Sequence, residues 1–509
     1  MDMRRLVPTF GDVLFCAVMG QILVSPRTFH DGDSFRHTAT GLLILSTGHV
    51  PTVDPFSFTH PGAEWVVQEW LSGVLFALAY RGLGWNGVAL ISGVAVASSL
   101  YIGYRLALSR GVSVFPAFVV MFGATAATML HWLARPHVFT MVIAMTWLWL
   151  LLRARDGQGS WAWFAPIMVV WVNLHAGFMM GFALLGLSFG VDLVHAALGD
   201  ASIRRRLVPT ALAIGATLGA ACLNPCGPAL LAYPLHVVDG RWAWLLSHVG
   251  EWLPPNLREE RWFEVGLVCS AAILIQSRRG LSLFEGVVLV FNAHAAFFMV
   301  RAVPLSALLS SWIIAERAGD AAFASTMSLE TVPALARVRE RAGALSAEFV
   351  DYEIKGGLFA ALSVLACLLV SAMGGRVGPW QLLDATPDSA RYPVAALAWA
   401  EERGVEGNPF TTDLWGGYLI FAGWPRYRVF VDGRSDMYGV AFMSEYVDVV
   451  NGGSSSEAVL DRYGVDWVLF DHDGPLVRTL LASGHWHRAY ADTVADVLLR
   501  GAPDAEGAL

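Results

Sequence analysis

The chain has 509 residues, of which 55% are hydrophobic and only 15% are charged, and its mean hydropathy is +0.52. This composition excludes an ordinary soluble protein and predicts a polytopic membrane protein. The formal net charge is −8, with the excess of carboxylates in the C-terminal part, and without a basic patch the chain is not expected to bind nucleic acid.

Apolar runs of about 15 to 20 residues predict membrane-spanning helices. Eleven such runs occur, at residues 9–25, 85–104, 112–130, 138–152, 161–174, 176–195, 207–223, 263–277, 281–299, 302–316 and 357–374. No convincing small-residue cleavage site follows the first run, so we expect it to be an uncleaved first helix.

Arginines at alternate connections set the expected orientation, because short cytoplasmic loops are enriched in Lys and Arg. These are Arg4, Arg5, Arg105, Arg110, Arg153, Arg155, Arg204, Arg205, Arg206, Arg278 and Arg279. The alternation holds only if residues 66–82 do not span, so we predict an amphipathic helix at the membrane interface over residues 68–84. The expected protein lies in the cell inner membrane with its N-terminus in the cytoplasm.

Two stretches in the second half of the chain, in addition to the loops between spans, are predicted to lie outside the membrane. Residues 317–355 form a cytoplasmic connector, which completes a transmembrane domain of residues 1–375. Residues 376–509 then reach the periplasmic side, where alternating strand and helix patterns predict a small soluble α/β domain. Expected strands are 409–412, 427–431, 467–470 and 495–499, and expected helices are 394–403, 441–449, 456–463 and 475–482.

The predicted periplasmic loop 26–84 begins with His30-Asp31-Gly32-Asp33. A carboxylate at a membrane surface can act as a general base on a hydroxyl group, or can bind a divalent cation. The structural alternative is that Asp33 caps the helix that follows. Asp54 and Glu69 lie in the same loop, where turn chemistry and a helix dipole are their respective alternatives.

More polar residues fall on the same predicted side of the membrane. They are Arg135, His137, Asn173, His175 and Arg301. An arginine fork fits phosphate oxygens and a histidine adds a donor, although an interfacial arginine can also extend to the headgroups without a ligand. Because a transporter more often places such groups at the midplane, their convergence on one face favours an enzyme.

Other segments give weaker signals. The outer loop around Asn224 and Glu251 supplies prolines and aromatics for a sugar-binding wall or for packing. The Gly pair within residues 413–418 is a weak phosphate-loop signal, and residues 431–436 are typical of a turn. We interpret the C-terminal domain as accessory or acceptor-binding. The five scattered cysteines are interpreted as small apolar side chains, with a disulfide as the minor alternative.

The order of these features resembles the GT-C superfamily of membrane glycosyltransferases, which includes protein O-mannosyltransferases, lipid A aminoarabinose transferases and oligosaccharyltransferases. Asp31-Gly32-Asp33 is followed by a helix over 39–48, a turn and the Glu69-Trp70 interfacial helix before the second span. The cytoplasmic turn with Arg105 and Arg110 and the outer C-terminal domain continue the match. The early DGDSF and late VDGRSD segments also resemble a group of uncharacterised bacterial membrane proteins.

The resemblance implies an inverting transfer of a sugar from a polyprenyl-phosphate-linked donor to a hydroxyl of a glycan, lipid or protein acceptor on the periplasmic face. It assigns the general base to Asp33 or Asp31, with Asp33 slightly favoured because it directly precedes the first interfacial helix. From the chemistry of the side chains themselves, we expect the donor phosphate to be bound by Arg135, His137, Arg301 and His175. The expected supporting, acceptor-binding or metal-binding residues are His30, Asp54, Glu69 and Asn173.

A divalent metal ion is the one cofactor that the resemblance leaves open, because members of the superfamily differ in their need for it. The alternatives in function are a lipid or polysaccharide transporter, a non-catalytic envelope-assembly protein, and a ligase or polymerase of lipid-linked glycans. Charged residues at the midplane of several spans would favour the transporter.

Overall fold

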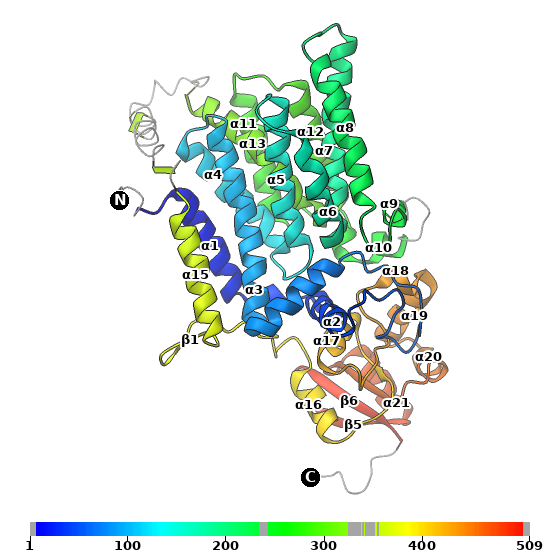
Figure 1. The fold of residues 1–509 in the computed structure, drawn as a ribbon. Helices are drawn as coiled ribbons and strands as arrows, with labels where there is room; N and C mark the ends of the chain where they lie inside the picture. Colours follow the sequence, from blue (N-terminus) through cyan, green and yellow to red (C-terminus); the bar gives the residue numbers. More distant parts are fainter. Residues whose placement is uncertain are drawn as a thin grey trace.

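A computed structural model describes residues 7–233, 243–323 and 356–501, with isolated residues between 337 and 353. A bundle of long helices forms most of the molecule, and a smaller unit of helices and a sheet lies at one end of it (Figure 1). The predicted connector 317–355 lies largely outside the described residues, apart from its first part, which continues a bundle helix to Phe323.

Helices occur at all eleven positions where the sequence predicts a span. They are α1 (Phe10–Val24), α3 (Trp70–Ser109), α4 (Val114–Thr128), α5 (His137–Arg155), α6 (Phe164–Leu174), α7 (Met179–Ala197), α8 (Arg204–Ala221), α11 (Arg261–Gln276), α12 (Leu283–Phe298), α13 (Val303–Phe323) and α15 (Leu358–Ala372). Four helical segments are long and apolar enough to cross a membrane, and shorter apolar helices accompany them. The protein is a polytopic helical membrane protein, and the count of eleven spans stays a prediction.

Helix α3 contains a break at Gly84, whose φ of 60° and ψ of −153° are not helical. Glycine adopts a positive φ without the steric cost that a Cβ would bring. The residues before Gly84 correspond to the predicted helix 68–84, and those after it to the second predicted span. The first part of α3 lies with α2 (Gly32–Thr47) across one end of the bundle (Figure 1).

Short helices connect the long ones and shape the same end of the molecule. They are η2 (Pro26–Phe29), η3 (Met129–His131), η4 (Trp161–Trp163), η5 (Ala176–Phe178), α9 (Ala229–Ala232), α10 (Ala243–His248), η7 (Gly250–Trp252) and η8 (Val300–Ala302). The Ala134 amide donates to the Thr28 carbonyl at 2.8 Å, which fixes the segment before α5 against the start of α2.

The C-terminal unit contains a four-stranded sheet of order β3-β4-β6-β5, in which β3 and β4 are parallel and the other pairs antiparallel. Its strands are β3 (Pro409–Phe410), β4 (Trp467–Asp471), β5 (Trp486–Ala491) and β6 (Ala495–Arg500), after a hairpin of β1 (Arg376–Val377) and β2 (Trp380–Gln381). Its helices are α16 (Val394–Glu402), α17 (Asp413–Ala422), α18 (Ser435–Tyr438), α19 (Val440–Val450), α20 (Ser456–Arg462) and α21 (Pro475–Ser483).

Two details of this unit differ from the sequence-based expectation. The segment 427–431 is not a strand of the sheet, because Val429 pairs instead with the loop of the other half of the chain: its amide donates to Phe56 and its carbonyl accepts from Phe58. Strand β5 was not predicted, since its mostly half-exposed side chains give no clear alternation.

The C-terminal unit is tightly joined to the loop 26–84. Helices α2 and α17 approach so closely that a Cβ on Gly417 would lie 2.3 Å from the Gly32 carbonyl oxygen. The Tyr392 hydroxyl donates to the Phe29 carbonyl at 2.9 Å. The Gly pair of residues 413–418 is therefore a helix-packing feature and not a phosphate loop, and the domain boundary at 375 stays a prediction.

Candidate active site

A cavity of about 430 Å³ lies where the bundle meets the C-terminal unit. Its walls come from α2, the loop before α3, the α6–α7 turn, the segments around η7 and η8, and residues 413–436. The charged and imidazole side chains that line it are Asp31, Asp33, Arg36, His37, Glu69, Arg135, His175, Glu251, Arg301, Asp413, Arg434 and Asp436. Six of the ten predicted site residues are thus brought together.

Asp31 and Asp33 meet at the start of α2 and share one arginine. Asp31 is the N-cap, and its Oδ1 accepts the Asp33 amide at 2.8 Å. Arg135 bridges the two carboxylates, with Nη1 at 2.9 Å from Asp31 Oδ2 and Nη2 at 2.9 Å from Asp33 Oδ2. Arg36 binds the other oxygen of Asp33, with Nη2 at 2.7 Å and Nε at 3.0 Å.

The two carboxylates differ in proton affinity because Asp33 has an additional guanidinium. Burial raises the pKa of Asp31, and the attraction of Arg135 offsets this only in part. Burial acts in the same direction on Asp33, but Arg36 and Arg135 together outweigh it and hold the pKa of that carboxyl well below its usual value. Asp31 is therefore the stronger base of the pair, although the sequence slightly favoured Asp33.

Glu251 of η7 connects the two arginines that were predicted to bind phosphate. Its Oε2 lies 3.0 Å from Arg135 Nη1, and its Oε1 lies 3.4 Å from Arg301 Nη1. Burial would raise the pKa of Glu251, but Arg135 and Arg301 lower it to about 2. The Arg301 guanidinium also lies over the Trp252 ring, 4.3 Å from its centroid. Glu251 was considered in the sequence only as part of a loop wall.

Glu69 lies between two histidines. His37 Nε2 is 3.1 Å from Glu69 Oε2, and His175 Nε2 is 3.4 Å from Glu69 Oε1. His175 Nδ1 accepts the Gly177 amide at 2.9 Å, so the proton of the neutral ring is assigned to Nε2, facing Glu69. Burial lowers the pKa of His175 to about 4, whereas the imidazoles outweigh burial and lower that of Glu69 to about 2.

The structure places the other four predicted residues outside the cavity. His137 donates from Nε2 to the His131 carbonyl at 2.7 Å, so this nitrogen is not directed at a phosphate. His30 Nε2 lies 3.2 Å from Asp388 in the C-terminal unit. The Asn173 side chain bonds Trp70 Nε1 through its oxygen and two backbone carbonyls through its nitrogen. All three positions have packing roles that the sequence pattern did not separate from ligand binding.

Asp54 is also outside the cavity and belongs to a buried ion cluster. Arg434 Nη1 lies 2.7 Å from Asp54 Oδ1, and Arg434 Nε lies 2.7 Å from Asp432 Oδ1. The guanidinium lies over the Trp65 ring at 4.5 Å, and the Tyr438 hydroxyl donates to Asp432 at 2.8 Å. Residues 431–436, predicted as a simple turn, thus fix the C-terminal unit to the loop that carries the site.

The C-terminal unit forms one wall of the cavity. A Cβ on Gly433 would lie 2.7 Å from Asp33 Oδ1, so the backbone of this residue lies against the acidic motif. Asp413 at the start of α17 receives the Tyr446 hydroxyl at 3.0 Å, and burial raises its pKa. Beyond the DG dipeptide no sequence signal indicates the contact of Gly433 with Asp33, because the partners are some 400 positions apart in the chain.

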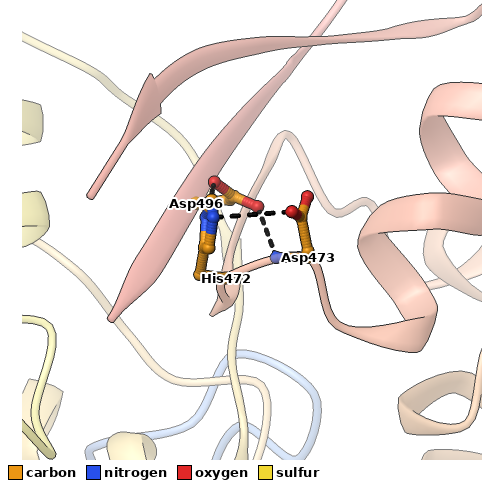
Figure 2. A group of neighbouring side chains, drawn as sticks. All are labelled: His472, Asp473 and Asp496. Carbon is orange, nitrogen blue, oxygen red and sulfur yellow. Dashed lines mark hydrogen bonds and ion pairs between the residues drawn. The ribbon is translucent and has the colours of Figure 1, made fainter. Parts of the chain in front are cut away.

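The three carboxylates around Arg135 do not fit a resident metal as they are arranged. Asp31, Asp33 and Glu251 all point at Arg135, whose guanidinium takes the place that a cation bound by these three groups would need. Among the residues that the structure describes, one group has metal-ligand spacing, and it lies elsewhere, at His472, Asp473 and Asp496 (Figure 2). There Arg488 Nη2 pairs with both aspartates.

No protein-family model matches the sequence, and no curated protein does. Solved structures that align with this chain include the following two. ArnT from Cupriavidus metallidurans aligns with a TM-score of 0.51 at 13% identity, over 96% of this chain and 97% of that one. The oligosaccharyltransferase AglB from Archaeoglobus fulgidus, solved with an inhibitory peptide and a dolichol-phosphate, aligns with a TM-score of 0.48 at 11% identity, over 91% of this chain and 69% of that one.

The chain has a GT-C fold. The resemblance drawn from the acidic motif and the order of the spans is confirmed at the level of the fold. Within this fold the cavity lies at the end of the bundle, between loop 26–84 and residues 413–436.

Proposed function

We propose that the protein is a membrane glycosyltransferase that moves a sugar from a polyprenyl-phosphate-linked donor to a hydroxyl acceptor in this cavity. The observation that carries the proposal is the Arg135 bridge between Asp31 and Asp33, which places a base and a phosphate ligand side by side in a GT-C fold. The predicted orientation puts the cavity on the periplasmic side, where a lipid-held donor needs no cytosolic nucleotide.

Arg135 and Arg301 are the proposed ligands of the donor phosphate. Both guanidiniums now contact the Glu251 carboxylate, an anion that lies between them. A phosphodiester offers the same arrangement of acceptor oxygens with greater charge, so donor binding would exchange phosphate for Glu251. The two arginines would then stabilise the negative charge that builds up on the leaving phosphate.

Asp31 is the proposed general base. It takes the proton of the acceptor hydroxyl while that oxygen bonds to the anomeric carbon, and the bond from this carbon to the phosphate oxygen breaks with its electron pair on the phosphate. Attack opposite the leaving group inverts the anomeric configuration. Asp33, saturated by Arg36 and Arg135, keeps Arg135 in position and takes no proton.

The buried ion pairs of the helices support this proposal over a transporter. Asp192 near the end of α7 pairs with Arg206 in the first turn of α8 at 2.9 Å, and Glu285 in the first turn of α12 pairs with Arg317 at 2.7 Å. Such pairs join the ends of helices, whereas a transporter more often places its polar groups at the midplane.

Lipid analysis of cells tests the function whichever sugar is transferred. Deleting the gene should cause polyprenyl-phosphate-linked sugars to accumulate in the lipid extract, as measured by mass spectrometry. The wild-type chain should reverse the accumulation, and Asp31→Asn should not. If the parent strain expresses the protein and deletion of the gene leaves the lipid profile unchanged, the proposed transferase activity is refuted.

A further inference from the structure

A second polar cavity, of about 380 Å³, lies at the opposite end of the bundle from the candidate active site. It is bounded by the C-terminal ends of α3 and α5 and by the connection before α12. Arg135 and Arg153 flank the two ends of α5, and 18 residues at about 1.5 Å each separate them by roughly 27 Å. This is close to the thickness of a bilayer core, so the two cavities lie at the two membrane surfaces.

Three arginines from three separate elements line this cavity: Arg110, Arg153 and Arg279. Arg110 Nε lies 2.9 Å from Glu316 Oε1, and Arg279 Nη1 lies 2.9 Å from Glu316 Oε2. The Glu316 side chain is 1% exposed, so it holds these two guanidiniums from behind. Arg110 Nη1 is paired in addition with Asp156, whereas the Arg279 side chain is 52% exposed.

Arg153 differs from the other two arginines. Among the described residues its guanidinium contacts only the Gln158 carbonyl, at 3.3 Å, and it has no carboxylate partner there. The one acidic side chain that lines the cavity, Asp156, pairs with Arg110. The cavity therefore keeps uncompensated positive charge at Arg153.

The apolar part of the lining consists of Leu106, Trp149 and Leu152, of which the two leucines are buried and Trp149 is partly exposed. A tryptophan beside arginines is typical of the headgroup layer of a membrane. A soluble anion would gain nothing from the Trp149 ring, whereas the glycerol region of a lipid would pack on it. Basic pockets between membrane helices bind anionic headgroups for this reason.

We infer that this cavity binds the phosphodiester headgroup of an anionic phospholipid at the face opposite the active site. Arg153 and the exposed Arg279 bind the phosphate oxygens, Arg110 adds positive charge beside them, and Trp149 packs on the glycerol region. The site does not depend on the proposed glycosyl transfer, because none of its residues lies in the first cavity.

Native mass spectrometry of the purified full chain tests the site, with phosphatidylglycerol as the probe and phosphatidylcholine as the neutral comparison. Arg153→Gln is the test variant because it breaks no ion pair. The matched control is Arg205→Gln, an exposed arginine on the same face of the molecule and outside the cavity. A circular dichroism melt of each variant confirms that it is folded.

We expect one phosphatidylglycerol to be retained by the wild type and by Arg205→Gln, and binding to weaken about five-fold in Arg153→Gln. Equal weakening in the two variants would show a general attraction of basic residues to anionic lipid and would overturn the site. Equal retention of phosphatidylcholine would do the same. Displacement of the lipid by millimolar inorganic phosphate would reassign the cavity to a soluble anion.

Discussion

Two arginine–carboxylate clusters lie beside each other in this molecule and are built from the same groups. Arg135 contacts Asp31, Asp33 and Glu251, and its side chain is 15% exposed in the cavity. Arg434 contacts Asp54 and Asp432, and the three side chains are between 0% and 3% exposed. The first cluster opens into the cavity, whereas the second is almost completely buried and only Arg434 of its three members reaches the cavity wall.

The difference between the clusters comes from their second partners. Asp54 accepts two backbone amides and the Ser57 hydroxyl in addition to Arg434, so both of its oxygens are fully used. Asp31 accepts one amide and one guanidinium and retains a raised pKa from burial. An ion pair alone therefore does not distinguish a carboxylate that could react from a structural one. The number of hydrogen-bond acceptor positions that the carboxylate has left is the more informative property.

The largest expected effect is on turnover in Asp31→Asn. Loss of a general base lowers the rate by about 10²–10⁴-fold, and asparagine keeps the side-chain oxygen that caps α2, so the unfolding temperature should change little. The accumulation of donor lipid in cells measures the loss. Asp33→Asn is the comparison: it frees Arg36 and Arg135 and should weaken donor binding more than it slows the chemical step. If Asp31→Asn retains wild-type turnover, Asp31 is not the base.

Substitutions in the buried cluster of Arg434, Asp54 and Asp432 should change the free energy of unfolding instead of turnover. Arg434→Leu leaves two buried carboxylates without their counter-charge, which costs about 3–5 kcal/mol. Thermal unfolding of the purified protein measures the change. Arg462→Leu removes an arginine that pairs with Glu445 at the surface and is 55% exposed, and it should lower the unfolding temperature far less. Similar unfolding temperatures for the two variants would contradict the assignment of Arg434 as a buried anchor.

A smaller loss of stability is expected from a substitution at the contact between α2 and α17, which lies between the two clusters. Gly417→Ala places a methyl group against the Gly32 carbonyl and should destabilise the chain by about 1–3 kcal/mol through overpacking. Gly215→Ala in α8 has open space around the new methyl group and serves as the control. A Gly417→Ala protein as stable as the wild type would show that the two helices separate easily.

The pH dependence of stability tests the burial of His175. The unfolded imidazole binds a proton below about pH 6.5, whereas the folded one does so only below about pH 4. The unfolded state therefore binds more protons between these values, and the free energy of unfolding should fall as the pH falls from 6.5 to 4. His175→Asn should show a shallower fall over this window in chemical denaturation, and an identical slope would contradict the burial.

The smallest effect is expected at the group of His472, Asp473 and Asp496, of which the first two are exposed and Asp496 is buried. Asp473 is 58% exposed, and Arg488 already supplies its positive charge. His472→Ala should change the unfolding free energy by less than about 0.5 kcal/mol, as is usual at a surface. Addition of Zn²⁺ or Mn²⁺ should leave the unfolding temperature unchanged. A metal-dependent increase in the wild type that His472→Ala removes would establish a metal site there.

Much of the fold could be predicted because its signals are local. Apolar runs give helix positions directly, and the arginine alternation correctly separated residues before and after Gly84. The same alternation predicted Arg135, His175 and Arg301 on one face with the acidic motif, and in the structure these residues line one cavity. Side-chain direction was not predictable in this way: His137 and Asn173 satisfy neighbouring backbone carbonyls.

The contribution of the C-terminal unit could not be predicted, because it depends on pairs far apart in sequence. Val429 has the pattern of a sheet strand, but its backbone pairs with Phe56 and Phe58. Gly433 and Gly417 look like turn or flexible positions, and only the approach of Asp33 and Gly32 explains them. Strand order and helix contacts between residues this far apart in the chain produce no periodic pattern that could be recognised in a single sequence.

The cavity's construction from both ends of the chain has a consequence for biosynthesis. Asp31 and Asp33 leave the ribosome about 400 residues before Gly433, which lies against them in the finished protein. Until translation and membrane insertion are complete, the acidic motif has no opposite wall. The candidate site is therefore complete only when the last segment has docked.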